Sequence, residues 1–570
     1  MFEHPADARR QCISDACCTG MAPGIMWHVD RRTASLARIA VAFCCLAELL
    51  TSWPDACTMF SSDGLLPLDD SVHSGLTVHR FNCAGTMGLL LAHGAASIGL
   101  MLGHCPVACG LFTYAMQLSL LHRGIWLAVG DSYLLCSFVL WVSLLSMPSK
   151  PIQHAVSVHS LAALGLKLQV VLLYATAAMI KVGAHRETEA TEAAQSGSGV
   201  DGAQVSWLTS TQRAASPWLD GTAVAEVLTC SEYQRPAGRL LLGVCLEHAW
   251  VCAGLTWGTL VLQAASPVLL LVLDGWLRFA AVIAFASLHL VRARRMNPSH
   301  ATRAAAHRIR TSRRLHSPGT LVCATQGMHA TLELGNFSLV SCAGLIIFIP
   351  SKPWQLIFEL GGARLRRWLA VNADHAAARG SWHARGALAS DILSVALIVV
   401  GLITSVESMR PEIRELCTWA RHQDAPPAAS SSSSALAHLA SQLSSKTATV
   451  GHLLGMLPRA DMFHVPPDDC GFWVLPSRLA NGSDVDAYRL YHHPHMSATR
   501  PFGTPPMHPT ALRPLWHRFY EQLSVTSQFN ITKRPVGVAA MRRRRLAEHH
   551  CEHFSQIGMV HVDIIFVVER

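Results

Sequence analysis

Apolar residues dominate the chain in long, nearly unbroken runs between residues 36 and 405. A membrane-crossing helix needs about 20 such residues, whereas the strands of a membrane barrel alternate apolar and polar residues over about 10. The runs lack this alternation, so the pattern predicts helices. We place nine segments, at 36–53, 86–104, 106–121, 131–147, 157–182, 239–262, 265–291, 329–350 and 388–405.

Several segments fall short of about 20 residues, so the pattern predicts between eight and ten transmembrane helices. The composition agrees, because 51% of the residues are hydrophobic and 15% are charged, whereas soluble proteins carry roughly 25% charged residues. We therefore expect an all-α polytopic, multi-pass integral membrane protein whose first partner is the lipid bilayer. In a eukaryote, the expected location is the endoplasmic reticulum membrane.

Basic residues indicate the orientation, because cytoplasmic loops carry an excess of Lys and Arg. Four arginines place the N-terminus in the cytoplasm: Arg9, Arg10, Arg31 and Arg32. The basic loop from Arg292 to Arg314 would also prefer the cytoplasm, which nine simple crossings do not allow. Either the region 239–291 contains three segments, or one span is re-entrant.

Polar stretches mark the limits of the expected transmembrane domain. Residues 1–34 are predicted to form a cytoplasmic N-terminal segment, and residues 35–405 the transmembrane domain. Two stretches inside this domain, 187–217 and 292–326, are predicted to be disordered insertions.

A small soluble part is expected after the membrane domain. Ser, Pro and Ala are frequent in residues 406–449, which predicts a flexible linker. Asn481-Gly482 between apolar stretches predicts a β-hairpin, and the alternation in VHVDIIFVVER predicts a strand. We therefore expect a C-terminal α+β domain over residues 450–570.

The net charge of +9 does not indicate a nucleic-acid partner. The arginines cluster in loops beside apolar segments, as membrane topology requires, and no nucleic-acid-binding motif accompanies them. None of the 18 cysteines forms a Cys-x-x-Cys pair, so we expect most of them to be small buried hydrophobes. No His or carboxylate pair has the spacing of metal ligands, so we expect no metal.

Ionisable side chains inside apolar segments are candidate functional residues, because idle ones are costly in lipid. Asp274 and Arg278 are four residues apart, which predicts a structural ion pair. Glu48 is expected to meet the membrane interface or a partner cation. His289 alone is more typical of a satisfied interior histidine than of a catalyst. The other candidates are Asp131, Lys181 and Glu247.

Lys181 closes the apolar string LQVVLLYATAAMIKVGAHR, and two interpretations account for it. Near a helix end, a lysine stem can cover apolar surface while the ammonium reaches the membrane interface. Alternatively, burial disfavours the charged form, so a desolvated lysine can act as a general base toward a weak acid such as a quinol.

Short motifs in a fixed order give the chain a resemblance to one family. The first segment leads into Asp63-Gly64-Leu65-Leu66-Pro67. Later motifs read HRGIWLAVGDSYLL, KLQVVLLYATAAMIKVG, SPWLDG, CLEHAW, LRFAAV, SLHL and LGNFSLVSCAGLIIFIPSKPW. Together they resemble the HTTM (horizontally transferred transmembrane) domain family, in the superfamily of vitamin K-dependent γ-carboxylase. The resemblance covers residues 35 to 525.

The resemblance implies a chemistry. In the carboxylases, a lysine seven residues after a tyrosine deprotonates vitamin K hydroquinone. Oxygen then converts the quinol to an epoxide through an alkoxide, which removes a γ-proton from a protein glutamate, and CO2 adds. The matching residues here are Tyr174 and Lys181. The implied partners are reduced vitamin K or a related isoprenoid quinol, and a protein or peptide glutamate.

The resemblance also implies roles for other residues. Lys181 looks like the general base, with Asp131 and His289 as further catalytic candidates. Quinol-binding candidates are Tyr174, Trp218, Glu247 and Arg278.

The chain departs from the animal enzymes at three positions. Asp131 stands in place of their His, Ile180 in place of a second Lys, and Ala460 in place of a usual Trp. The animal enzymes also carry a much larger lumenal region that handles the propeptide of their substrates, so we expect quinol chemistry more strongly than glutamate carboxylation. Two alternatives are a non-catalytic isoprenoid- or lipid-binding protein of the same fold and a transporter, although no internal repeat typical of transporters is visible.

Overall fold

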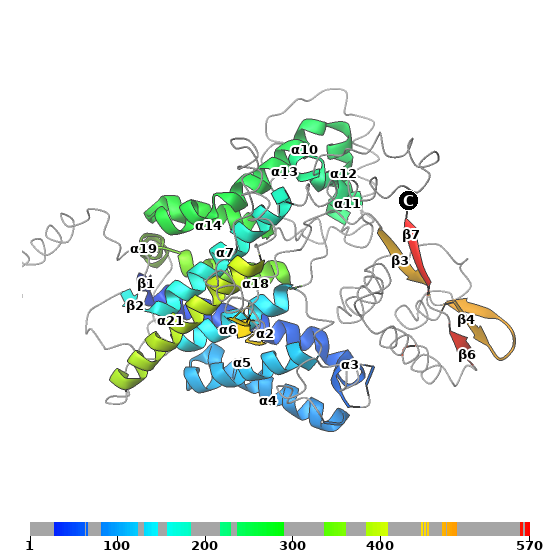
Figure 1. Cartoon of the computed structure of the whole chain (residues 1–570), viewed down its shortest axis with the longest axis horizontal. Coiled ribbons are helices and arrows are strands. Elements are labelled where there is room, and N and C mark those ends of the chain that lie inside the picture. Colours follow the sequence, from blue (N-terminus) through cyan, green and yellow to red (C-terminus); the bar gives the residue numbers. More distant parts are fainter. Residues whose placement is uncertain are drawn as a thin grey trace, which may run out of the picture.

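In the computed structural model, the described residues are mostly helical, with a few short strands (Figure 1). The predicted insertion at 187–217, apart from Pro217, the one at 292–326 and most of the predicted linker at 406–449 lie outside the described residues. The described residues are 28–62, 64–65, 81–123, 130–145, 157–183, 217–229, 236–289, 336–360, 383–408, 446–447, 450–451, 453–454, 456, 470–474, 476–486, 546, 559–562 and 565–569.

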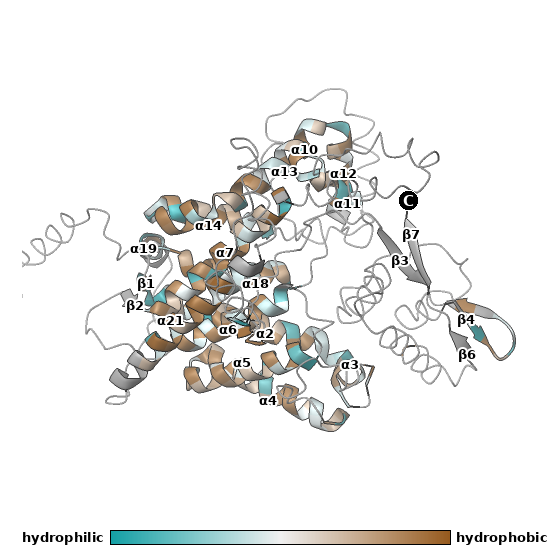
Figure 2. Ribbon diagram, in the orientation of Figure 1, coloured by the Kyte–Doolittle hydropathy of each residue, from teal (hydrophilic) through white to brown (hydrophobic). Residues whose placement is uncertain are grey.

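Three helices are long and apolar enough to cross a membrane: Arg31–Phe60, Cys83–Leu102 and Leu161–Val182. The bent pair Gly238–Glu247 and Ala249–Ala264 adds a fourth if it is one span. Apolar residues cover most of these helices, and the shorter helices packed among them are also largely apolar (Figure 2).

The first half of the helical bundle follows the predicted segments closely. Asp30 caps the first helix, because its side chain accepts a hydrogen bond from the Arg32 amide. The strand β1 (His28–Asp30) pairs antiparallel with β2 (Ser157–His159). The helices are α2 (Arg31–Ser52), η2 (Trp53–Asp55), α3 (Ala56–Phe60), α4 (Cys83–Leu102), α5 (Pro106–Arg123), α6 (Gly130–Leu145) and α7 (Leu161–Gly183).

The second half contains shorter elements. They are α10 (Pro217–Asp220), α11 (Ala223–Thr229), α12 (Pro236–Glu247), α13 (Ala249–Ala264), the π-helix η5 (Pro267–Val272), α14 (Gly275–His289), α18 (Phe337–Leu345), η6 (Ile346–Phe348), α19 (Ser351–Leu360) and α21 (His383–Ser408).

Two predicted segments, 239–262 and 265–291, are not single straight helices. The first is broken between α12 and α13, which meet at 118°. Ala265 and Ser266 keep right-handed helical dihedrals, so α13 runs on into η5. The second break follows η5, where Leu273 is extended and Gly275 has a φ of 58°. The region 239–291 therefore contains three helical segments.

The core of the bundle is centred on α6, whose side chains are almost all buried. The Trp141 ring packs where a side chain on Gly165 of α7 would lie, and the Phe138 ring does the same at Gly344 of α18. Glycine at these two positions lets the helices approach closely. Cys44, Cys45 and Cys136 are buried in this part of the bundle, as predicted.

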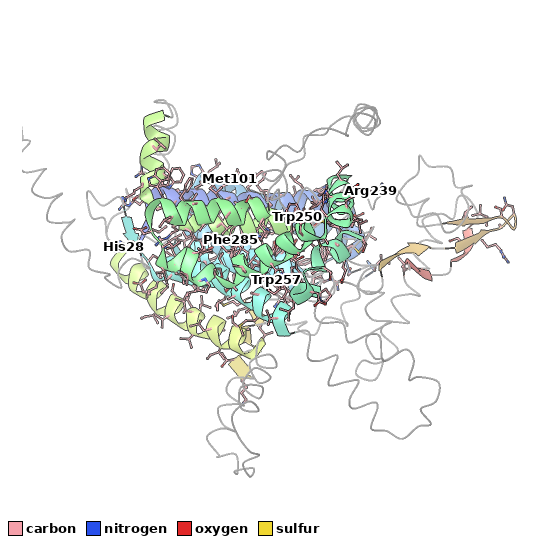
Figure 3. All side chains as sticks on the ribbon, turned by 90° about the horizontal axis from the view of Figure 1, so that it is seen from above. His28, Met101, Arg239, Trp250, Trp257 and Phe285 are labelled. Atoms are coloured by element: carbon pink, nitrogen blue, oxygen red, sulfur yellow. A yellow bond between two sulfur atoms is a disulfide. The ribbon has the colours of Figure 1, made fainter. Side chains whose placement is uncertain are left out.

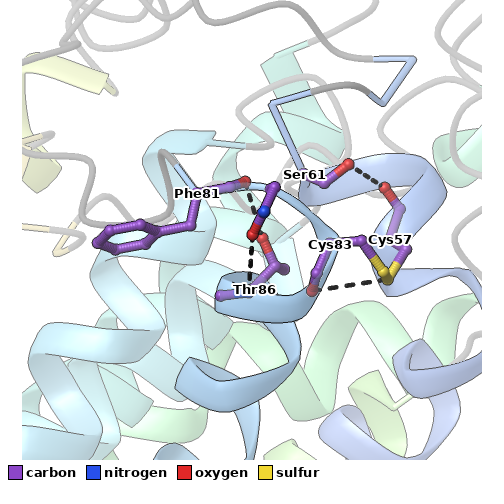
Figure 4. Close-up of a disulfide and its surroundings, with 7 residues drawn as sticks. Cys57, Ser61, Phe81, Cys83 and Thr86 are labelled. Carbon is purple, nitrogen blue, oxygen red and sulfur yellow. Dashed lines mark hydrogen bonds between the residues drawn. A yellow bond between two sulfur atoms is a disulfide. The ribbon is translucent and has the colours of Figure 1, made fainter.

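One end of the bundle is held by a disulfide that the sequence did not predict. Cys57 of α3 and Cys83 of α4 are linked, with their Cα atoms 4.8 Å apart (Figure 4). Beside it, Arg123 donates hydrogen bonds to the carbonyls of Phe60 and Ser61 at 3.2 and 2.7 Å. These contacts join the ends of α2–α3, α4 and α5.

The opposite end carries the small sheet. The Lys167 Nζ donates to the His28 carbonyl at 2.9 Å, and Thr33 Oγ1 donates to the Ile349 carbonyl at 3.0 Å. His28 lies at one end of the bundle, and Arg239 and Trp250 lie toward the other (Figure 3). The disulfide and the small sheet therefore mark opposite ends of the helical bundle.

A short segment beyond α21 returns into the bundle. Met456 is 0% exposed and belongs to the main hydrophobic core. Tyr114 and His122 of α5 hydrogen-bond to the carbonyls of Leu454 and Leu453 at 2.9 and 2.8 Å. The predicted boundary at residue 450 assigned this segment to the C-terminal domain, whereas its described residues pack with the helices.

Five strands are described after this segment. The predicted hairpin is present, because β4 (Pro476–Leu479) pairs antiparallel with β5 (Asp484–Asp486) and Gly482 in the turn has a φ of 81°. The strand β4 also pairs with β6 (Met559–Val562), and β3 (Cys470–Val474) pairs with β7 (Ile565–Glu569). A separate C-terminal α+β domain stays a prediction.

Candidate functional site

Lys181 lies on the last turns of α7 and is 4% exposed. Its Nζ donates a hydrogen bond to Oε1 of Gln263 at 2.8 Å. The same nitrogen lies 4.4 Å from the centroid of the Trp218 ring. The ammonium or amine group therefore has a neutral amide oxygen on one side and an aromatic face on another.

Trp218 reaches Lys181 because a tight turn fixes α10 against α13. Gly221 has a φ of 80°, and a Cβ at this position would lie 3.0 Å from Ala253. The Gly221 carbonyl accepts hydrogen bonds from Thr256 Oγ1 at 3.1 Å and from Cys252 Sγ at 3.3 Å. Only glycine combines this backbone conformation with so close an approach.

Tyr174 lies seven residues before Lys181, so both side chains project from the same face of α7, two turns apart. Its hydroxyl is 3.0 Å from Nε2 of His289, which comes from the last turn of α14. The Tyr174 ring lies 4.6 Å from Phe285, and His289 lies 5.5 Å from Phe337, centroid to centroid. His289 thus has a buried phenol partner rather than standing alone.

Lys181 and Tyr174 lie on one face of α7. Trp218 contacts Lys181 there, and His289 contacts Tyr174. The structure brings together these four of the residues that the resemblance selected. Gln263 joins them and was missed by sequence reasoning. The signal was an amide within the apolar string LTWGTLVLQAA, because a polar side chain in such a segment needs a partner.

Asp131 directly precedes Ser132, which belongs to a second polar cluster. Asp131 is buried at the start of α6, and the Ser132 hydroxyl donates to Glu48 Oε1 at 3.1 Å. The other oxygen of Glu48 accepts from the Gln117 amide at 2.7 Å. These two contacts join Glu48 to a hydroxyl and an amide, and the interface or partner cation that we expected for it stays a prediction. Gln117 and Ser132 were missed because each comes from a different helix.

Glu247 and Arg278 do not belong to the Lys181 cluster. Glu247 is exposed at the bend between α12 and α13. Arg278 is on the first turn of α14, and His289 is on the last, which separates them by about 16 Å of helical rise. The quinol-binding roles expected for Glu247 and Arg278 are therefore not supported by their positions.

Arg278 instead holds the break before α14. Its Nε donates to the Leu273 carbonyl at 2.6 Å, and its Nη2 lies 3.7 Å from Asp274 Oδ1. Asp274 has a side chain that is 62% exposed, so this ion pair contributes little by itself. The structural pair expected from the four-residue spacing is present.

Within the described residues, no group of three or more His, Cys, Asp or Glu side chains is arranged to hold a metal ion. No protein-family model, no curated protein and no solved structure matches the chain.

Proposed function

We propose that this chain is a multi-pass integral membrane protein in which Lys181 accepts a proton from the hydroxyl of an isoprenoid quinol. The observation that carries the proposal is the setting of Lys181, which is buried against the neutral side chains of Gln263 and Trp218. Burial favours the uncharged amine, and only the uncharged amine can accept a proton.

The order of the helices supports a membrane protein with nine crossings. They would be α2, α4, α5, α6, α7, α13 with η5, α14, α18 with η6, and α21. The helix α12 is not counted separately, because it meets α13 at 118° and the bent pair is taken as one broken span. An odd number of crossings places residues beyond α21 on the side opposite to the N-terminus. Seven crossings precede the basic loop from Arg292 to Arg314, so this topology places the loop on that same opposite side, against the preference expected from its charge.

The disulfide supports an assignment of the two sides. Disulfides persist in oxidising compartments and are rare in the cytosol. The end of the bundle with Cys57–Cys83 would then face the lumen or the exterior, in agreement with a cytoplasmic N-terminus. Lys181 ends α7, which starts beside the opposite end at His159 and Lys167, so the candidate site would lie toward the lumenal face.

The surrounding side chains suit a quinol. A substrate with an aromatic ring would find stacking partners in Trp218 and Tyr174. The quinol, when bound, supplies the reducing equivalents of the reaction. The chain supplies the base and an apolar site that excludes water.

The test is vitamin K hydroquinone epoxidation, with CO2 fixation into a glutamate peptide as a second readout, in membranes that contain each variant. We expect Lys181→Ala to lower epoxidation by roughly 10²–10⁴-fold, the usual loss for a general base. Lys167→Met is the matched control, because Lys167 is also buried on α7 but contacts the other end of the bundle. Equal epoxidation by wild type and Lys181→Ala would refute the proposal. The CO2 signal decides whether a glutamate is a substrate.

A second candidate function is binding of an isoprenoid quinone without turnover. It is favoured by the position of Asp131, which lies at the start of α6 and not among the contacts described for Lys181. Under this alternative, a photoreactive vitamin K analogue labels the wild-type protein, and neither wild type nor Lys181→Ala produces epoxide.

A further inference from the structure

Arg38 is an unusual side chain in the first helix. It is 6% exposed. Among the described residues, no hydrogen-bond acceptor reaches its Nε or its Nη2. Buried guanidinium nitrogens without an acceptor are costly, so the Nε and Nη2 of Arg38 point to an anion that completes them.

The guanidinium of Arg38 lies against the end of α4. A Cβ at Gly103 would be 2.9 Å from Nη2 of Arg38, and Gly103 has a φ of 76°. The last carbonyls of α4 already have donors, because Gly103 N–H bonds to Leu100 at 3.2 Å and His104 N–H bonds to Gly99 at 2.9 Å. This is a Schellman motif, which closes the helix without Arg38.

The depth of Arg38 follows from the pairing of α2 with α4. The two helices are antiparallel, with Cys57 opposite Cys83 at one end and Arg38 opposite Gly103 at the other. About 28 Å of helical rise separates the two contacts, close to the 30 Å thickness of a hydrocarbon core. If the disulfide faces the oxidising side, Arg38 lies at the level of the cytoplasmic headgroups.

We propose that Arg38 binds the phosphate of an anionic phospholipid in the cytoplasmic leaflet, at the corner where α2 meets the turn from α4 to α5. A guanidinium matches a phosphate with two parallel hydrogen bonds. The cytoplasmic leaflet is rich in anionic lipids, and basic sites between helices on this side bind their headgroups. Exposed apolar side chains of both helices flank the turn and suit acyl chains: Ile98, Leu102, Leu111 and Phe112.

The inference rests on the proposed membrane insertion but not on quinol chemistry. Its test is lipid binding by delipidated protein in a neutral detergent, followed by native mass spectrometry with phosphatidylserine or phosphatidylcholine. We expect wild type to retain one phosphatidylserine at about tenfold lower lipid concentration than phosphatidylcholine, because the phosphatidylserine headgroup carries a net negative charge whereas choline neutralises the phosphate of phosphatidylcholine. Arg38→Gln should lose this preference, and Arg31→Gln, in the first turn of the same helix, should keep it.

Three outcomes would overturn the proposal, and the Arg38→Lys variant tests the geometry of the contact. Equal retention of the two lipids by wild type excludes an anionic-lipid site, and this arm does not depend on whether Arg38→Gln folds. Arg38→Lys keeps the positive charge but loses the two parallel hydrogen bonds of the guanidinium. If this variant folds and shows no preference between the two lipids, the paired hydrogen bonds are required for the preference. Competition by inorganic phosphate at the same concentration as the lipid would assign the site to free phosphate instead. Loss of the preference in Lys181→Ala as well would show that it arises elsewhere.

Discussion

At the scale of single residues, the proposed proton transfer to Lys181 depends on the contact between Lys181 and Gln263. The amide oxygen accepts from Nζ at 2.8 Å and fixes where the nitrogen points. A base has to be held within hydrogen-bond reach of the proton that it takes, so this contact is as important as the burial of the lysine.

Gln263→Leu should therefore reduce quinol turnover about tenfold, because a hydrogen bond to a charged or ionisable group contributes about 1.5 kcal/mol. The measurement is the rate of epoxidation at saturating quinol. Trp218→Phe is the comparison, since it keeps an aromatic face beside Nζ. A Gln263→Leu enzyme with the wild-type rate would show that the amide does not position the base.

At the scale of the elements, close helix approach depends on small residues. Gly165→Ala should destabilise the bundle by roughly 1–3 kcal/mol, because its methyl group would overlap the buried Trp141 ring between α6 and α7. Thermal unfolding in detergent measures this. Gly254→Ala is the control, because nothing lies within 4 Å of a Cβ there. If both variants lost the same stability, the packing at Trp141 would not be the cause.

The segment that returns after α21 is a second element whose packing can be tested. Met456→Ala should lower the free energy of unfolding by about 2–5 kcal/mol, the cost of a cavity in a filled core. Val450→Ala, at a residue 43% exposed, should cost less than about 0.5 kcal/mol. A Met456→Ala protein as stable as wild type would mean that the segment does not contribute to the core.

At the scale of the whole molecule, the proposed topology makes a prediction about sidedness. Asn481-Gly482-Ser483 fits the glycosylation pattern and lies in the exposed hairpin turn beyond α21. Expressed in a eukaryotic cell, the chain should carry a glycan that Asn481→Gln removes, as seen by a glycosidase-sensitive shift on a gel. A protease-accessible C-terminal tail on the cytosolic face of intact microsomes would contradict nine crossings.

The sequence predicted the helices where the apolar pattern was long and uninterrupted. The first five segments correspond to α2, α4, α5, α6 and α7 with ends that differ by a few residues. The later segments were less accurate, because breaks at His248 and Leu273 lie inside apolar stretches that hydropathy averages over. Neither the disulfide nor the return of Met456 could be predicted, because both join residues far apart in the chain.

The candidate site was predictable only where its residues share one helix. Tyr174 and Lys181 share a helix face, which their spacing alone establishes. His289, Trp218 and Gln263 come from three other elements, and only the fold brings them to α7. Arg278 and Glu247 were assigned to the site by motif, but their positions at the start of α14 and at an exposed bend separate them from it.

The measurement that tests the central claim most directly is chemical rescue of Lys181→Ala. A small primary amine, such as ethylamine, can replace the missing nitrogen if Lys181 acts as a base. We predict that the variant regains at least a tenth of the wild-type epoxidation rate as amine concentration rises, about tenfold or more above its own baseline, while wild type and Lys167→Met do not respond. Correct insertion is verified by the intact Cys57–Cys83 disulfide. Full epoxidation by the variant without amine, or no epoxidation by correctly inserted wild type, would contradict the account.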